Sequence, residues 1–308
     1  MSGWPKLDYA ADRPTLESAH LLLQLIGKLP TRLHPWVNHG WHVALRAMPR
    51  GFVTRALPAG ERHFTAALDM LDGTIRVVCD NGTEASVPAA GRPIAEVHGA
   101  LSGALQALSL PAPLHGGPNE VPDPVPFADD HRPRQWDPAS ARALLGAFLR
   151  ADRNFNLFRS LYRGKSSASH LFWGSFDLAV MRFSGRTAPR HPGGIPNLPD
   201  SVTREAYSHE VISAGFWPGN ERYPQAAFYA YAYPAPPALA ETAVNPAGAH
   251  WLAELGEFVL PYEDVRAAPD PDGSVQAFLQ STYVAAAKLL DWPGGLTVGS
   301  SSVGRPPA

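Results

Sequence analysis

The stretch RHFTAALDMLDGTIRVVCD, residues 62–80, contains two strand-like segments separated by Asp72 and Gly73. The Asp-Gly pair favours a tight primed turn, because glycine accepts a positive φ. We therefore predict an antiparallel hairpin with strands at 62–71 and 74–80. This hairpin indicates an α+β protein built on antiparallel sheet, and the rest of the chain is interpreted around it.

The segments on either side of the hairpin complete an N-terminal half, at about 14–108. A helix is expected over Pro14–Leu29, where apolar residues recur at steps of three and four and form one stripe. The further elements expected in this half are strands at 41–48, 51–57 and 84–88 and a helix at 93–108. This half therefore has helices flanking antiparallel strands.

A loop at 109–136, which has neither a helical nor a strand period, leads to a second half at about 137–292. A loop of that length is either functional or a linker. Asp137 and Pro138 favour a helix start, so we expect a helix over 137–164. The elements expected beyond it are strands at 170–183, 204–217 and 226–233, a helix at 246–256, the short strand EFVLPY, and a last helix at 273–290.

The two halves share the order helix, strands, helix, which indicates either an internal duplication or two ordinary halves with a coincidental likeness. An alignment of the halves pairs Trp41 with Phe176 and His42 with Asp177. Since strand side chains alternate between faces, His42 and Asp177 then point away from the face of Trp41 and Phe176. We expect one domain over 1–298 and a disordered tail at 299–308.

Composition excludes several classes of protein. The formal net charge is −2, so no basic field is available for a phosphate backbone, and we expect no nucleic-acid partner. The single cysteine, Cys79, excludes an internal disulfide and any multi-cysteine metal cage. No run of 18 apolar residues occurs and no signal peptide begins the chain, so we expect no membrane span and a cytoplasmic location.

The stretch REAYSHEVISAGFW, residues 204–217, has the highest density of reactive side chains. If it is one strand, alternation places Glu205, Tyr207 and His209 on a common face. A carboxylate beside an imidazole can perform acid–base work, because each changes the proton affinity of the other. The same pair can bind a divalent metal, with histidine supplying nitrogen. The alternative is a polar face that is solvated or internally hydrogen-bonded.

Two further patterns carry alternatives of the same kind. The stretch HPWVNHGWH, residues 34–42, places His39 and His42 three residues apart, yet Pro35 and Gly40 exclude a helical metal pair, and a structural loop is the other interpretation. Three tyrosines alternate along 229–233, either as sheet packing or as one wall of an aromatic pocket. No nucleophile elbow, Walker loop or dinucleotide fingerprint occurs.

The chain resembles a family of uncharacterised bacterial proteins that is known only as a domain of unknown function. The resemblance spans about 3–292 and is carried by the phrases HPWVNHGWHVAL, PNEVPD, FWGSFDLAV with RFSGR, REAYSHEV and GFWPG. No activity is known for that family, so the resemblance implies none and assigns no catalytic residue.

We expect the polar segments to converge at the junction of the two halves and to form the site of an enzyme or a small-molecule binder. His209 and Glu205 are the expected acid–base or ligand groups, and His42 and Asp177 are expected to assist them. No cofactor is predicted, although a divalent metal is one version of this site. The alternative is a non-catalytic protein-interaction domain with a large exposed apolar patch.

Substrate contacts are expected from a second group of residues. Arg186 is expected to hold an anionic group, because a guanidinium matches carboxylate and phosphate geometry. Trp173 and Trp217 are expected to wall the pocket, with Tyr207 and Asn38 as further substrate-binding residues. The sequence leaves the substrate, the reaction and the oligomeric state open.

Overall fold

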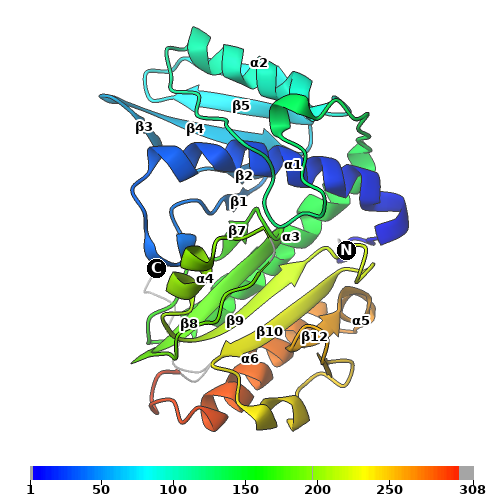
Figure 1. Cartoon of the computed structure of the whole chain (residues 1–308). Helices are drawn as coiled ribbons and strands as arrows, with labels where there is room; N and C mark the ends of the chain where they lie inside the picture. Colours follow the sequence, from blue (N-terminus) through cyan, green and yellow to red (C-terminus); the bar gives the residue numbers. More distant parts are fainter. Residues whose placement is uncertain (1–2, 196, 298–308) are drawn as a thin grey trace, which may run out of the picture.

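A computed structural model describes residues 3–195 and 197–297, and the expected tail at 299–308 lies outside them. The described residues form two antiparallel sheets of six strands each with six α-helices, which confirms the α+β prediction (Figure 1). The strands of one sheet all lie before residue 89 and those of the other all lie after residue 169. The loop predicted at 109–136 therefore separates the two sheets.

The N-terminal sheet is built around the hairpin at 62–80. Its strand order is β1-β2-β4-β5-β6, with β3 paired to β4. The hairpin is confirmed, but Asp69 pairs with Thr74, so four residues, 70–73, connect the strands in place of the predicted two-residue Asp-Gly turn, and Gly73 has a positive φ of 61°. The elements of this half are α1 (Tyr9–Leu33), β1 (Arg46–Met48), β2 (Gly51–Val53), β3 (Leu57–Ala59), β4 (Arg62–Asp69), β5 (Thr74–Cys79), β6 (Glu84–Pro88) and α2 (Ile94–Ala107).

The C-terminal sheet has the strand order β11-β12-β10-β9-β8-β7. It follows α3 (Pro138–Ser160), which begins as predicted, because the Asp137 carboxylate caps the backbone N–H of Ser140 at 2.7 Å. The remaining elements are β7 (His170–Phe172), β8 (Asp177–Thr187), α4 (Asp200–Ala206), β9 (His209–Trp217), β10 (Ala227–Tyr233), β11 (His250–Leu252), β12 (Glu257–Pro261), α5 (Tyr262–Ala267) and α6 (Pro271–Leu289).

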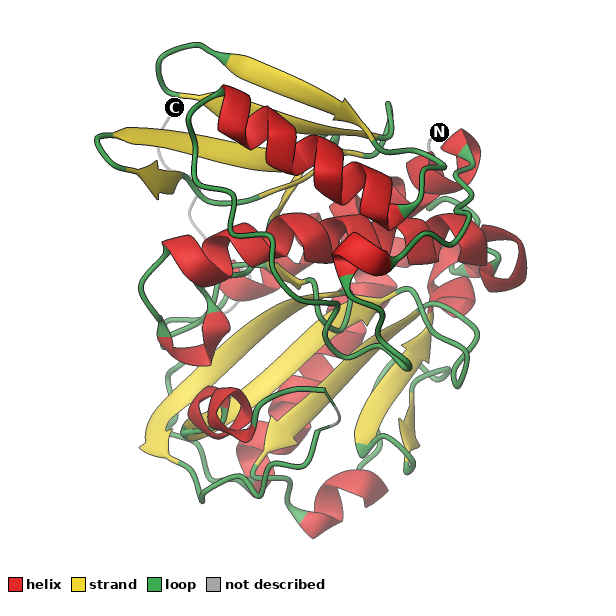
Figure 2. Ribbon diagram, turned by 45° about the horizontal axis from the view of Figure 1, so that its top comes forward, coloured by secondary structure: helices red, strands yellow, loops and turns green. Residues whose placement is uncertain are grey.

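The two halves are joined along one edge of each sheet and through a shared core. Leu45, just before β1, exchanges two backbone hydrogen bonds of 2.9 and 3.0 Å with Leu171 in β7. Helix α1 crosses between the sheets and packs on α3 (Figure 2). Buried apolar side chains from both halves form one continuous cluster, which fixes the sheets relative to each other.

The C-terminal sheet has two different faces. One face packs on α3 and α6, and there Leu178, Phe216 and Phe228 lie side by side across three strands and are fully buried. The opposite face carries α4, on the side away from α6 (Figure 1). Because strand residues alternate between faces, Asp177 and Ala179 point to that second face. The prediction that Asp177 points away from the face of Phe176 agrees with this arrangement, because Phe176 stacks on His20 of α1 and packs against Phe148 of α3, while Asp177 lines the cavity.

Several predicted elements differ from the structure. The single strands predicted at 51–57 and 170–183 are each two strands, β2 and β3 in the first case and β7 and β8 in the second. Residues 200–206 form α4, so strand β9 begins only at His209, and Pro199 with Asp200 provides the helix start that the strand interpretation overlooked. Residues 41–44 form turns, because His39 and Gly40 both have positive φ and reverse the chain. The helix expected at 246–256 is instead β11, which pairs with β12. No helix in the described ranges combines the length and apolarity that a membrane crossing needs.

Candidate functional site

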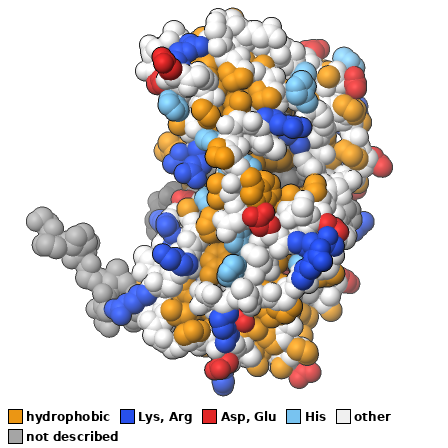
Figure 3. Space-filling view, turned by 60° about the vertical axis from the view of Figure 1, so that its left-hand side comes forward, with side chains coloured by type: hydrophobic (Ala, Val, Ile, Leu, Met, Phe, Trp, Pro, Cys, Tyr) orange, Lys and Arg blue, Asp and Glu red, His pale blue; other side chains and the backbone are white. Residues whose placement is uncertain are grey.

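A cavity of about 640 Å³ lies on the face of the C-terminal sheet that carries α4. The sheet forms its floor, and its walls and roof come from the segments at 36–43, 119–120, 172–175 and 198–207 together with Ile195. The side of the molecule that carries α4 comes forward in Figure 3, where apolar side chains and histidines gather between the two halves. The volume is within the range of small-molecule sites.

The floor of the cavity is organised around Asp177, the first residue of β8. Its two carboxylate oxygens accept hydrogen bonds from the hydroxyls of Ser175 and Tyr229. Burial raises the pKa of Asp177, although these two hydrogen bonds oppose the rise. Gly215 on β9 leaves room for the Tyr229 ring, because any Cβ at that position would overlap the phenol. The local sequence therefore supports one buried carboxyl with two fixed donors.

A second polar group extends along the same floor. Tyr231 follows Tyr229 on the cavity face of β10, and its hydroxyl lies 2.8 Å from that of Tyr207 at the end of α4. Burial raises the pKa of Tyr207 to about 12, so this phenol stays protonated near neutral pH. Glu257, the first residue of β12, also lines the cavity, and burial with the nearby Asp177 charge raises its pKa to about 8.

Glu120 faces this floor from the loop between the two halves. Its backbone has a positive φ of 56°, and its carboxyl fills the space that a side chain at Gly174 would take. Burial, and then the charge of Asp177, raise the pKa of Glu120 to about 7. Neither Glu120 nor Glu257 accepts a hydrogen bond or forms an ion pair with another described residue.

The loop that carries Glu120 is held by α1. The buried Gln24 side chain accepts from the Asn119 backbone N–H at 2.7 Å and donates to its carbonyl at 2.9 Å. The Lys28 ammonium donates to the Asn119 side-chain oxygen at 2.5 Å and lies 4.9 Å from the centre of the Trp173 ring. Lys28 thus binds an amide rather than a carboxylate. It does not form an ion pair with Asp177, Glu120 or Glu257.

The walls are aromatic and apolar. They include Trp36, Phe172, Trp173 and Trp217, and the exposed side chains of Trp36, Ile195 and Leu255 lie at the mouth. Among the described residues that line the cavity, none is lysine or arginine. Apolar walls with a few convergent polar groups are typical of sites for small organic molecules.

Two polar atoms at the roof have no partner. The Nδ1 of His39 and the hydroxyl of Thr203 are buried, line the cavity and form no hydrogen bond with any described residue. His39 is 7% exposed and Thr203 is 1% exposed. Buried polar atoms are normally satisfied by hydrogen bonds, so these two atoms are exceptions, and neither of them presents accessible surface to the cavity.

The structure brings together five of the nine residues that the sequence nominated. Asp177, His42, Trp173, Trp217 and Tyr207 all line the cavity. His42 is nearly buried, and its Nδ1 accepts from the backbone N–H of Val37 at 3.3 Å, which holds the loop of the roof in place.

The other four nominated residues do not line the cavity. Glu205 accepts a 2.6 Å hydrogen bond from Trp36, and His209 lies against the Ser208 hydroxyl at 3.1 Å. Arg186 is paired with Glu210 at 2.9 Å and also bonds a backbone carbonyl. Asn38 contributes its backbone carbonyl to the short helix that turns the chain at 38–40. The common face predicted for Glu205, Tyr207 and His209 is wrong, because only His209 belongs to a strand.

Sequence reasoning missed Glu120 and Glu257 as site residues. Glu120 lies in the phrase PNEVPD, which stands out as a polar segment of the long loop, but no local pattern indicates where its carboxyl points. Glu257 begins a predicted strand and resembles any strand-end acid. The wall interpretation of the tyrosine ladder holds for Tyr229 and Tyr231, which line the cavity.

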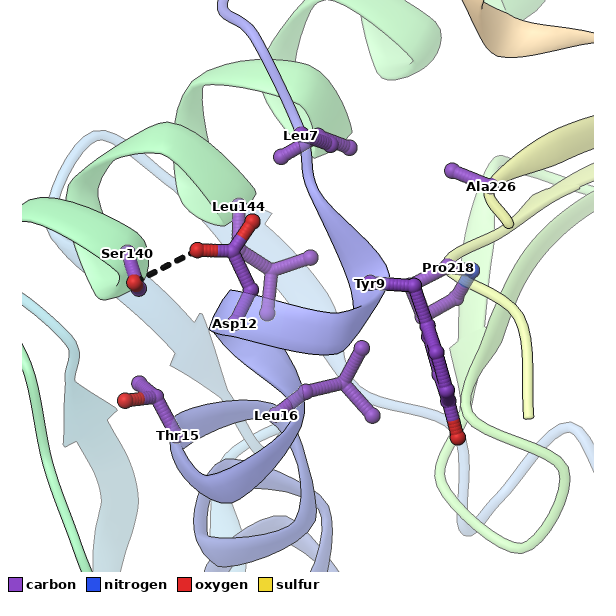
Figure 4. A pocket seen from close by; sticks show the side chains of 9 residues that line it. All are labelled: Leu7, Tyr9, Asp12, Thr15, Leu16, Ser140, Leu144, Pro218 and Ala226. Atoms are coloured by element: carbon purple, nitrogen blue, oxygen red, sulfur yellow. Dashed lines mark hydrogen bonds between the residues drawn. The ribbon is translucent and has the colours of Figure 1, made fainter. Parts of the chain in front are cut away.

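A second hollow is much smaller. It lies where the start of α1 packs on α3, and Asp12 there accepts a 2.6 Å hydrogen bond from Ser140 (Figure 4). Its volume of about 10 Å³ is at the lower limit for holding one water molecule, so it offers no room for an organic ligand.

Metal ligands do not converge in the described part of the chain. No three histidine, cysteine, aspartate or glutamate side chains at 3–195 and 197–297 are grouped so that they could hold an ion. The metal version of the site stays a prediction.

Comparisons with known proteins place the chain in a family without assigning it a role. No curated protein matches it. No solved structure matches it either. The model of one family, described as a family of unknown function (DUF5996), matches residues 4–297, which is nearly the whole chain. The protein therefore belongs to the DUF5996 family.

Proposed function

We propose that the cavity binds a small organic molecule and that Glu120 and Asp177 act on it by general acid–base chemistry. The observation that carries this proposal is that three carboxyls and three phenols line one cavity with apolar walls. Such titratable groups with altered proton affinity cluster at catalytic sites more often than elsewhere.

The proton affinities fit that role. Because the pKa of Glu120 is raised by burial to about 7, its carboxyl is divided between the protonated and ionised forms near neutral pH. A general acid or base works best when its pKa lies near the working pH. Ser175 and Tyr229 each donate to one oxygen of Asp177, and this residue lines the cavity.

The protein-interaction alternative has less support. It requires a large exposed apolar patch and no concave polar site. The exposed Trp36, Ile195 and Leu255 instead lie at the mouth of the polar cavity. A bacterial origin and a cytoplasmic location belong to the proposal, and both rest on the sequence.

A ligand screen tests the proposal. Purified protein is screened by thermal unfolding against a library of neutral, cationic and anionic metabolites, because ligand binding raises apparent stability. The same screen is run on Ala206→Trp, which fills the cavity from α4, and on the control Ala139→Trp, which lies on the exposed start of α3.

We expect compounds that stabilise the wild type and Ala139→Trp but not Ala206→Trp. Stabilisation that survives in Ala206→Trp would place binding elsewhere and refute the site. A library that shifts none of the three proteins would remove the small-molecule proposal. Metal analysis of the purified protein tests the metal version separately.

A further inference from the structure

The charge of the cavity is one-sided. Asp177, Glu120 and Glu257 line it, and no described lining residue carries a permanent positive charge. The two histidines at the roof, His39 and His42, have their pKa lowered by burial and stay neutral near pH 7. The acidic groups therefore face a space that contains no cation from the protein.

This arrangement is unlike that of the other buried acids of the protein. Asp69 is ion-paired with two arginines, and Asp130 is ion-paired with Arg132 and Arg134. Outside the cavity, the buried carboxylates Asp69 and Asp130 are thus neutralised by guanidinium groups. At the cavity floor the partners of Asp177 are the neutral hydroxyls of Ser175 and Tyr229.

The walls also suit a positive charge. Trp173, Trp217 and Trp36 line the same space, and an indole ring attracts a cation through its quadrupole. Lys28 already uses one side of the Trp173 ring in this way, at 4.9 Å, from behind the cavity wall.

We infer that the cavity takes an organic cation, a molecule whose protonated amine sits among Asp177, Glu120 and Glu257 while its apolar part lies against the tryptophans. The inference rests on the proposed function and names the class of its ligand. A neutral ligand such as a polyol gains no ion pair with these acids, whereas an ammonium does, so the cation is favoured.

Binding of an ammonium group should change the protonation of the cavity carboxyls. Burial raises the pKa of Glu120 to about 7 and that of Glu257 to about 8, so both carboxyls are largely protonated below neutral pH without a ligand. A bound ammonium stabilises the ionised forms, because an opposite charge lowers a carboxyl pKa. Binding should therefore release protons to solvent.

The test uses three probes that share a benzene ring and differ in charge: 2-phenylethylamine, 2-phenylethanol and phenylacetate. Binding is measured by quenching of tryptophan fluorescence at about pH 8 and about pH 5, and by calorimetry in buffers of different ionisation enthalpy. The proteins are the full-length wild type, Glu120→Gln, Glu257→Gln and the control Glu61→Gln, whose side chain lies on an exposed turn far from the cavity.

We expect the amine to bind at least about tenfold more tightly than the alcohol at the higher pH, because a desolvated charge pair is strong. Each cavity variant should weaken amine binding by about tenfold while leaving alcohol binding within about twofold. Glu61→Gln should match the wild type. The amine should also release protons on binding.

Equal or tighter binding of the alcohol or of phenylacetate would overturn the inference, as would amine binding that is insensitive to both variants. Failure of all three probes would overturn it too. The metabolite screen distinguishes the two proposals. Neutral or anionic compounds that stabilise the wild type but not Ala206→Trp would refute the cationic ligand and would leave the proposed acid–base site standing.

Discussion

Replacing Glu120 by glutamine should stabilise the protein in alkaline solution. The folded state raises the pKa of this carboxyl from 4.5 to about 7, chiefly through burial. A raised carboxyl pKa means that folding favours the protonated form, so its contribution to stability is present below pH 4.5 and is lost as the pH rises through about 7. Glutamine has nearly the same shape and no charge to bury.

The size of the effect follows from the two pKa values. Their difference, multiplied by 1.36 kcal/mol for each pH unit, gives about 3 kcal/mol of lost stability when Glu120 is fully ionised. Solvent in the cavity screens part of this penalty. We therefore expect the free energy of unfolding of Glu120→Gln to be about 2 kcal/mol higher than that of the wild type at about pH 8.5. At about pH 5 the gain should fall below about 1 kcal/mol.

Urea unfolding followed by tryptophan fluorescence measures both values, with Glu61→Gln as an exposed control that should change stability little at either pH. The reasoning fails if Glu120→Gln is less stable than the wild type at the higher pH. It also fails if the difference is the same at both pH values, since a packing effect has no reason to follow the ionisation of one carboxyl.

Three further substitutions should change the free energy of unfolding, again measured in urea. Tyr229→Phe removes a buried donor from Asp177 and should cost about 1.5–3 kcal/mol. Gly215→Ala should cost about 1–3 kcal/mol, because its Cβ overlaps the phenol on the next strand, whereas the matched Gly99→Ala faces open space on α2 and should gain about 0.5–1 kcal/mol. Asp69→Asn should cost about 2 kcal/mol at about pH 7. Burial alone would raise the pKa of Asp69, but hydrogen bonds that include those from two arginines lower it below 3.8. The cost of the substitution should therefore shrink as the pH falls below 3.8.

The parts of the fold that were predicted correctly depend on short-range chemistry. The hairpin at 62–80 needs only two strands and a short turn that contains Asp72 and Gly73, and α3 needs only the Asp137 cap and Pro138. The alternation of β8 placed Asp177 on the face opposite Phe176, where the cavity lies. These signals lie within a few residues of the feature that they predict.

Two of the four nominated acid–base residues, Glu205 and His209, lie outside the cavity for an equally specific reason. The interpretation of 204–217 as one strand assumed a period of two across a boundary between α4 and β9, so the alignment of Glu205 with His209 had no structural basis. Helices and strands of such short segments cannot be told apart by periodicity alone. Only Tyr207 of that group reached the cavity, at the end of the helix.

Glu120 was beyond the reach of sequence reasoning because its position is set by tertiary contacts. Gln24, which is 95 residues earlier, holds the backbone of Asn119 from both sides. The left-handed backbone of Glu120 then turns its carboxyl to Gly174 and the cavity floor. No spacing within the loop predicts that α1, in the N-terminal half, will hold this part of the loop in place.

The three carboxyls of the cavity reduce the stability of the free protein. Burial raises the pKa of Asp177, Glu120 and Glu257, so each of these carboxyls opposes folding when it is ionised, and the chain pairs none of them with a cation among the described residues. The same chain pairs Asp69 and Asp130 with arginines, so the means to neutralise a buried acid were available to it. Local rules of stability are broken mainly where function requires it. An ammonium group that enters the cavity supplies the missing charge only in the bound state, and this converts a cost in the free protein into affinity for the ligand.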